Sequence, residues 1–138
     1  MTYHQTQRAY HNVAHLYNFL NLATVYEAEL KRPDLFRWAI LYHDYVYEIG
    51  NKENEVLSAK EAIEVLSPYL KAFELAYIES LILATANHFL LSAADLAHLD
   101  IDTISLIMHD LPYFLDFDMA ILAASKEIYD KYTAALVI

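Results

Sequence analysis

The chain lacks cysteine and is poor in residues that form turns. Its 138 residues include 0 Cys, 1 Gly and 3 Pro. Without cysteine there is no disulfide and no thiolate metal ligand, so His, Asp and Glu would have to hold any metal ion. β-Sandwiches and barrels need a turn signal about every ten residues, and this sequence has too few. A composition rich in Leu, Ala, Glu and Tyr instead predicts an all-α protein.

Basic residues are also scarce. Lys and Arg number 9 against 19 Asp and Glu, which gives a formal net charge of -10. A protein that binds a nucleic acid duplex needs a basic face, so this role is not expected. The acidic charge would repel an anionic substrate unless a bound cation reversed the local field.

Long apolar runs are missing as well. The most apolar segment, 77–91, is interrupted by Glu79, Asn87 and His88 and is too short to span a bilayer. The N-terminus has no basic region followed by an apolar stretch, so no signal peptide is expected. These features predict a cytoplasmic protein that does not enter a membrane.

Apolar residues recur at helical spacing through most of the chain. They predict helices over about 10–30, 35–47, 53–70, 72–89 and 101–109, and a last helix from about 117. Pro33, Gly50, Pro68 and Pro112 mark the expected breaks or distortions. We expect one domain over residues 1–138, an all-α bundle of about five to six helices around one core.

A His-Asp dipeptide lies within the most apolar predicted helix. His43 and Asp44 stand between apolar and aromatic neighbours in 35–47, a helix apolar on nearly every face and therefore expected to be buried. An ionised Asp in such a helix is costly unless it is paired or bound to a metal ion. The dipeptide taken alone favours a hydrogen-bonded structural pair over a metal site.

Two other polar clusters have comparable alternatives. His11 and His15 are four residues apart and so project from one helix face, either toward a common site or toward solvent. Asp116 and Asp118 precede an apolar run, where either could cap a helix start or act as a ligand. We expect capping to account for one of the two.

Weaker clusters occur elsewhere. Asn54-Glu55 with Ser58 fits a solvated helix start, and Thr85 with His88 fits a satisfied core histidine. A second His-Asp dipeptide, His109-Asp110, is expected at a helix end beside Pro112, where solvent would reach its carboxylate; it is not expected to bind metal. His4 and His98 are expected on the surface.

The order of these elements resembles the HD-domain superfamily, and more closely a bacterial group described as predicted metal-dependent phosphohydrolases. The segment around His11 also resembles the start of the cyclic-nucleotide phosphodiesterase catalytic domain. The resemblance runs from Arg8 to about Tyr132. It rests on the ordered motifs Arg8-x-Tyr10-His11-Asn12-x-x-His15, Tyr42-His43-Asp44-x-Val46-Tyr47, Asn54-Glu55-x-x-Ser58-Ala59, Thr85-x-x-His88 and Asp116-x-Asp118-Met119-Ala120-Ile121-Leu122.

The resemblance implies a role for each matched polar residue. The metal ligands would be His15, His43, Asp44 and Asp118, with Asp118 preferred to Asp116 because the superfamily's last ligand falls in an Asp-Leu element. The catalytic pair would be His11, as general acid, and Glu55, which would orient it. Contacts to substrate or phosphate would come from Arg8, Asn12 and His88. A further C-terminal helix of the family pattern has no match in this sequence.

The expected function is therefore hydrolysis of a phosphate ester by metal-bound water. The substrate would be a small molecule of nucleotide type, and the ion would be Mn²⁺, Fe²⁺, Mg²⁺, Ni²⁺ or Zn²⁺, in one or two copies. Two alternatives stay open: a catalytically silent metal-binding module that senses a nucleotide or supports a partner, and a helical interaction module without metal. The sequence also leaves open a homo-oligomer.

Overall fold

The fold is all-α. The computed structural model describes residues 3–48, 50–86 and 94–137, and describes side chains between 13 and 120. These ranges contain no strand. Their helices are α1 Tyr3–Val25, α2 Pro33–Tyr42, α3 Asn54–Leu66, α4 Ala72–Ala84 and α5 Ile101–Val137, with one turn of 3₁₀ helix, η1 Glu27–Glu29. The predicted all-α class is confirmed.

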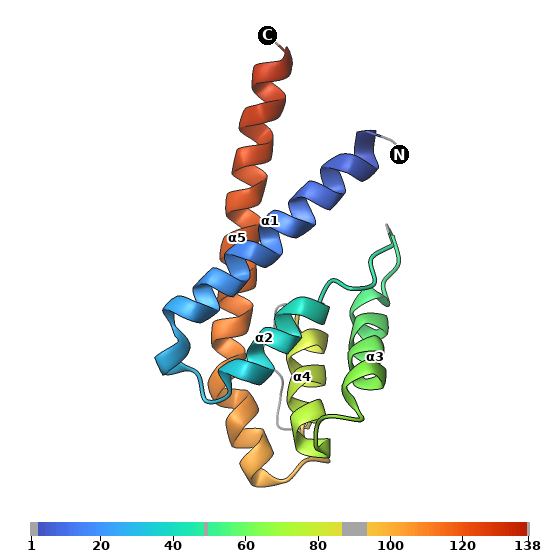
Figure 1. The fold of residues 1–138 in the computed structure, drawn as a ribbon, viewed down its shortest axis with the longest axis vertical. Helices are drawn as coiled ribbons and strands as arrows, with labels where there is room; N and C mark the ends of the chain where they lie inside the picture. The colour runs from blue at the N-terminus through green and yellow to red at the C-terminus, as the bar shows by residue number, and fades with distance from the viewer. Residues whose placement is uncertain (1–2, 49, 87–93, 138) are drawn as a thin grey trace.

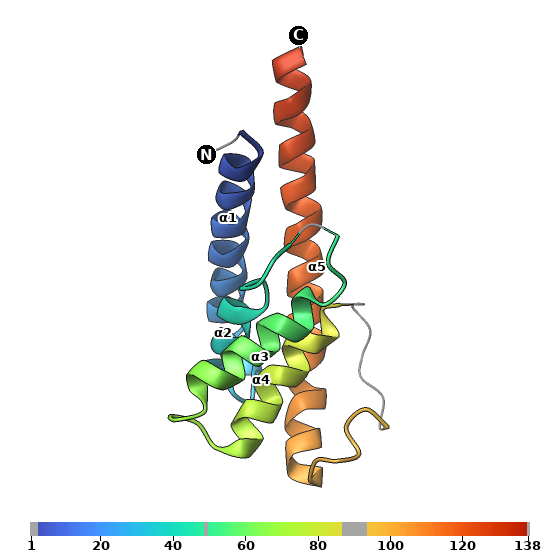
Figure 2. The ribbon, with the colours of Figure 1, turned by 90° about the vertical axis from the view of Figure 1, so that its right-hand side faces the viewer.

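The described part of the chain contains two long α-helices and three short ones. Helices α1 and α5 cross and then diverge toward the two chain termini, which lie at the same end of the molecule (Figure 1). Helix α4 packs against the lower half of α5, and α2 and α3 pack against α4, as the view turned by 90° also shows (Figure 2). No helix in the described ranges combines the length and apolar character that a membrane span requires.

An aromatic cluster fills the core where α1, α2 and α5 meet. Phe19, Phe36 and Phe114 are fully buried. The ring centroid of Phe114 lies 4.9 Å from that of Phe19 and 5.2 Å from that of Phe36. The rings of Phe19 and His43 are in contact, with centroids 5.3 Å apart, so the apolar core reaches directly to the polar site described below.

Helix α2 ends earlier than its apolar pattern predicts. The sequence predicts helix to residue 47, but α2 stops at Tyr42 and His43 is its C-cap. The N–H of Tyr45 donates to the carbonyl of Tyr42 in a tight turn, and the N–H of Val46 donates to the Ser58 hydroxyl of α3. Because α3 binds the backbone here, tertiary contacts outweigh helix propensity.

Helix α5 is continuous where two helices and a break were predicted. Pro112 lies inside it, although proline removes one helical hydrogen bond and crowds the preceding turn. Its neighbours Leu111, Phe114 and Leu115 are buried in the core on successive turns. That burial offsets the local cost of the proline, which is about 3 kcal/mol in an isolated helix.

Candidate metal centre

Three buried polar side chains meet where α1, α2 and α5 come together. His15 lies on α1, His43 directly follows α2 and Asp118 lies in α5. Their exposed fractions are 5%, 3% and 3%. Residues distant in the sequence thus form one polar cluster at the edge of an aromatic core.

The ligand atoms of this cluster face one another. The Nε2 atoms of His15 and His43 are 3.2 Å apart. The Oδ1 of Asp118 lies 2.9 Å from His15 Nε2 and 3.5 Å from His43 Nε2. The Oδ2 of Asp44 lies 3.2 Å from His43 Nε2. One atom from each of His15, His43 and Asp44 fits within 4.8 Å, a grouping that could hold a metal ion.

A backbone hydrogen bond sets the tautomer of His43. Its Nδ1 contacts the carbonyl oxygen of Ile40. A carbonyl can only accept, so Nδ1 carries a proton, and a neutral His43 ring directs the lone pair of Nε2 into the cluster. Histidine ligands of metal ions are commonly fixed in this way.

Protons alone cannot satisfy every contact of the cluster while both carboxylates are ionised. A proton on His43 Nε2 leaves the lone pair of His15 Nε2 facing Asp118. A proton on His15 Nε2 leaves the lone pair of His43 Nε2 facing both carboxylates. Protons on both rings bring two N–H groups together. A cation among these ligand atoms would remove this conflict, and His15, His43 and Asp44 are close enough together to hold one.

The spacing of the ligand atoms agrees with this fit. Two atoms bound at about 2.1 Å from one ion lie about 3.0 Å apart in octahedral geometry and about 3.4 Å apart in tetrahedral geometry. The four distances given above run from 2.9 to 3.5 Å. With His15 bound through Nε2, its proton would sit on Nδ1, a buried atom without a hydrogen-bond partner among the described residues.

Asp44 is not the buried helical residue that the sequence predicted. It lies in the turn after α2, and 44% of its side chain is exposed. The early end of α2 explains the error, since the premise of a buried carboxylate required the helix to continue to residue 47. Asp44 is thus the solvent-facing member of the cluster.

Charges around His43 change its acid-base properties. Burial disfavours the charged ring, but Asp118 and Asp44 outweigh burial and raise the pKa of His43 to about 10. Burial likewise opposes ionisation of Asp44, while His43 beside it lowers the pKa of that carboxyl below its ordinary value. Both shifts express the attraction of this site for positive charge.

The two acidic residues near the start of the last predicted helix lie in different environments. Asp118 is buried against both imidazoles, whereas Asp116 is exposed. Both lie within α5. The expectation that one of them caps a helix is therefore wrong, because the helix begins at Ile101.

The polar residues of α3 and α4 have structural partners. The Ser58 hydroxyl accepts from Val46 N–H and donates to Val46 O, and Asn54 bonds to the backbone of Glu48 in the same way. Thr85 donates to the carbonyl of Ile82 at the end of α4. Glu55 is half-buried in the first turn of α3 and has no hydrogen-bond partner among the described side chains.

The remaining predicted site residues lie outside the described side chains. Arg8, His11 and Asn12 belong to α1, where only their backbone is described, and His88 falls outside the described residues. The backbone places His11 one turn before His15 on the same helix. The proposed roles of these four residues remain predictions.

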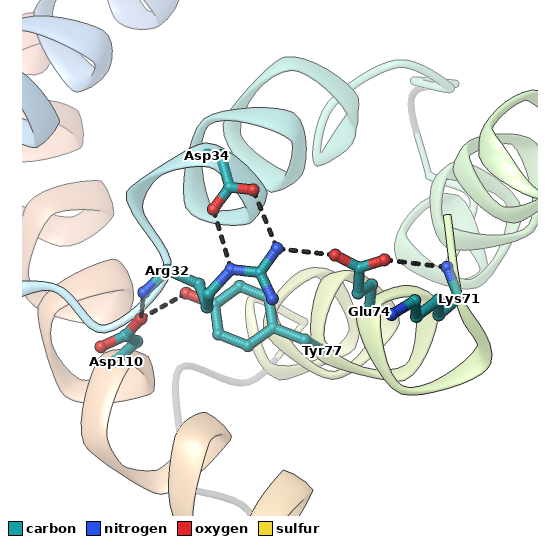
Figure 3. A network of polar contacts seen from close by, with 6 residues as sticks. All are labelled: Arg32, Asp34, Lys71, Glu74, Tyr77 and Asp110. Carbon is teal, nitrogen blue, oxygen red and sulfur yellow. Dashed lines mark hydrogen bonds and ion pairs between the residues drawn. The ribbon is translucent and has the colours of Figure 1, made fainter. Parts of the chain in front are cut away.

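The buried carboxylate belongs to the second His-Asp dipeptide, whose His109 is exposed. Asp110 was expected to be solvated at a helix end, but it lies inside α5 and is fully buried. It accepts hydrogen bonds from Arg32 N–H and the Tyr77 hydroxyl (Figure 3). It also accepts one from Lys31 N–H. His109 Nδ1 lies 2.7 Å from Asp110 Oδ1. No sequence motif indicated these donors, because two of them are backbone groups.

Comparisons with known proteins add no family assignment. No protein-family model matches the chain, and no curated protein and no solved structure matches it either. The function of the chain is therefore inferred from its sequence motifs and from the geometry of the buried cluster.

Proposed function

We propose that this chain is a metal-dependent phosphohydrolase of the HD type, with an ion held by His15, His43, Asp44 and Asp118. One observation carries the proposal. The buried His15, His43 and Asp118 converge from three helices in an arrangement that protons alone cannot satisfy. The buried carboxylate of Asp110, by contrast, has matching hydrogen-bond donors.

Two imidazoles and two carboxylates suit Mn²⁺, Fe²⁺, Mg²⁺, Ni²⁺ or Zn²⁺. A bound divalent ion lowers the pKa of a coordinated water and polarises a phosphoryl group. The exposed carboxylate of Asp44 marks the side from which water and phosphate would reach the centre. His15 and His43, both buried, would hold the ion away from bulk solvent.

The general acid in this proposal is His11, which would protonate the leaving oxygen. Its position one turn before His15 on α1 supports the assignment. Arg8, three residues earlier, would bind phosphate, and Asn12 and His88 would contact the substrate. Glu55 would orient His11. The substrate would be a small phosphate ester of nucleotide type.

Metal content and hydrolysis, measured on the same samples, test the proposal. Protein stripped with a chelator and reloaded with Mn²⁺ should retain the ion and release phosphate from at least one member of a nucleotide panel. The substitutions His43→Ala and Asp44→Ala should weaken metal binding, whereas His11→Ala should keep the ion and lose hydrolysis. His98→Ala, at an exposed position, is the matched control.

Each outcome of this test has a distinct meaning. Retention of Mn²⁺ with no ester cleaved would favour a silent metal-binding module and overturn the enzymatic part. Failure of the folded wild type to bind any of the five candidate ions would overturn the metal centre and leave a helical interaction module.

A further inference from the structure

Asp110 is a buried carboxylate outside the candidate metal centre. It accepts from Lys31 N–H at 2.9 Å, Arg32 N–H at 3.1 Å and the Tyr77 hydroxyl at 2.6 Å. His109 Nδ1 lies 2.7 Å from Oδ1, the oxygen that also accepts from Lys31 N–H. Burying a carboxylate completely is costly, and partners from the loop before α2, from α4 and from α5 offset that cost. Asp110 therefore joins three separate segments of the chain.

The backbone donors to Asp110 lead directly into α2. Arg32 is the N-cap of α2, and its own side chain does not cap the helix. The guanidinium instead pairs with Asp34 and Glu74 (Figure 3). A carboxylate at a helix N-terminus satisfies free N–H groups and opposes the positive end of the helix dipole. Asp110 supplies this carboxylate from α5, so it fixes the start of α2 to α5.

The candidate metal centre joins the same two helices at a second point. His43 directly follows Tyr42, the last residue of α2. Asp118 lies eight residues beyond Asp110 on α5, about 12 Å along the helix axis. The contact between His43 Nε2 and Asp118 Oδ1 is 3.5 Å. Helices α2 and α5 are thus connected at both ends of α2, once by Asp110 and once by the metal-centre residues.

We propose that Asp110 is a positioning residue for the metal centre. By holding the start of α2 on α5, it sets the separation of His43 from Asp118 before any ion binds. Ligands must be held within about 0.5 Å of their productive positions for tight binding, and short rigid helices transmit such a constraint. Asp110 touches neither the ion nor the substrate. The inference rests on the proposed function for the identity of the site.

The test measures Co²⁺ binding to the full chain. Co²⁺ binds ligand sets of this kind, and its visible absorption reports coordination geometry. In Asp110→Asn, Co²⁺ should bind at least tenfold more weakly than in the wild type and show an altered absorption band. Asp34→Asn is the matched control, because it breaks the neighbouring pair with Arg32 but removes no bond to Asp110. Its Co²⁺ affinity should stay within twofold of wild type.

A second measurement needs no metal. The His43 N–H donates to the carbonyl of Ala39 at 2.9 Å, and its hydrogen exchange reports how firmly the end of α2 is held. Exchange at His43 should be at least tenfold faster in Asp110→Asn and unchanged in Asp34→Asn. A folded Asp110→Asn protein with wild-type Co²⁺ affinity and wild-type His43 exchange would overturn the proposal.

Two further outcomes are also decisive. If Asp110→Asn does not fold, Tyr77→Phe removes one donor and keeps both backbone bonds to Asp110. It should weaken Co²⁺ binding two- to fivefold, and unchanged binding would contradict the positioning role. If the wild type binds neither Co²⁺ nor any of the five candidate ions, the proposed function fails, and His43 exchange alone then decides whether Asp110 positions the end of α2.

Discussion

Asp118 is the residue on which the candidate metal centre most depends, because its Oδ1 lies against both imidazoles. Replacing Asp118 by Asn removes the buried negative charge. His15 and His43 then have no carboxylate of Asp118 beside them. We expect Asp118→Asn to lower Mn²⁺ affinity about 100-fold or more, since even substitutions beside metal ligands cost 10- to 100-fold. Isothermal titration calorimetry would measure the loss.

The control for that substitution lies two residues away. Asp116 carries the same carboxylate and lies in the same helix, α5, but is exposed to solvent. Asp116→Asn should leave Mn²⁺ affinity unchanged. An equal loss of affinity in both variants would mean that general acidity of the surface, and not the buried cluster, attracts the ion.

Tyr77 makes the stability of the fold sensitive to high pH. Burial and the neighbouring Asp110 raise the pKa of Tyr77 above its ordinary value, so the folded state favours the neutral phenol. The unfolded chain ionises this group near pH 10. The stabilisation is therefore complete below about pH 10 and is lost as the pH rises above the unfolded value. Urea midpoints measured between pH 7 and pH 11 should fall at the alkaline end.

The substitution Tyr77→Phe tests whether Tyr77, and no other tyrosine of the chain, causes the alkaline sensitivity. Tyr77→Phe loses a 2.6 Å hydrogen bond and should be less stable at pH 7. Its further loss between pH 9 and pH 11 should be smaller than that of the wild type. Parallel curves for the two proteins would show that Tyr77 does not cause the alkaline sensitivity.

At this scale the sequence predicted some site residues and misjudged others. The ordered motifs selected His15, His43 and Asp118, and the fold brings these three together. The two Asp residues of the His-Asp dipeptides were placed in the wrong environments: Asp44 is exposed and Asp110 is buried. Burial of a carboxylate depends on where a helix ends and on distant backbone donors, and neither is encoded in neighbouring residues.

Among the elements, α3 controls the segment that follows His43 and Asp44. The buried Ser58 holds both backbone groups of Val46 through one hydroxyl. Ser58→Ala leaves these groups without their partner and should lower the free energy of unfolding by about 1–3 kcal/mol. Chemical denaturation would measure the change, and the affinity for Mn²⁺ should fall with it because Asp44 precedes this segment.

Ser67 provides the comparison for Ser58. It is exposed at the end of α3, and its hydroxyl donates to Glu64 O over 3.4 Å. Ser67→Ala should change the free energy of unfolding by less than about 0.5 kcal/mol. If Ser58→Ala were equally mild, the contact with Val46 would not be what ends α2 and shapes the turn at Asp44.

Element boundaries were predictable where local signals agree with packing. The start of α4 after Lys71 was predicted correctly, and the start of α2 at Pro33 was predicted two residues late, at 35. The continuity of helix α5 was not predictable from local signals. Pro112 predicts a break, but buried residues on both sides of it keep the helix continuous. The continuity matters for the site, because it places Asp110 and Asp118 on one rigid element.

On the scale of the whole molecule, charge is distributed unevenly around the site. The chain carries a formal net charge of -10, yet α1 contains no Asp or Glu and one Arg. An anionic substrate approaching past α1 would therefore meet no carboxylate from that helix. A divalent ion at the cluster would add positive charge at the junction of α1 with α5, so the acidic composition is compatible with a phosphate ester substrate.

Metal binding should stabilise the whole fold, because the ligands come from α1, α5 and the end of α2. An ion that binds only the folded state at 100 times its dissociation constant adds about 2.7 kcal/mol to the free energy of unfolding. For a chain of this length that corresponds to a rise in Tm of roughly 9 °C. Calorimetry of the chelator-treated protein, with and without Mn²⁺, would measure the rise.

The two His-Asp pairs give this measurement its control. The rise in Tm should disappear in His43→Ala and persist in His109→Ala, since His109 contacts Asp110 and lies outside the cluster of His15, His43 and Asp118. A rise that survives His43→Ala would place the ion elsewhere on the acidic surface. A rise that vanishes only in His109→Ala would assign metal binding to the pair at Asp110, and the buried cluster would then need another explanation.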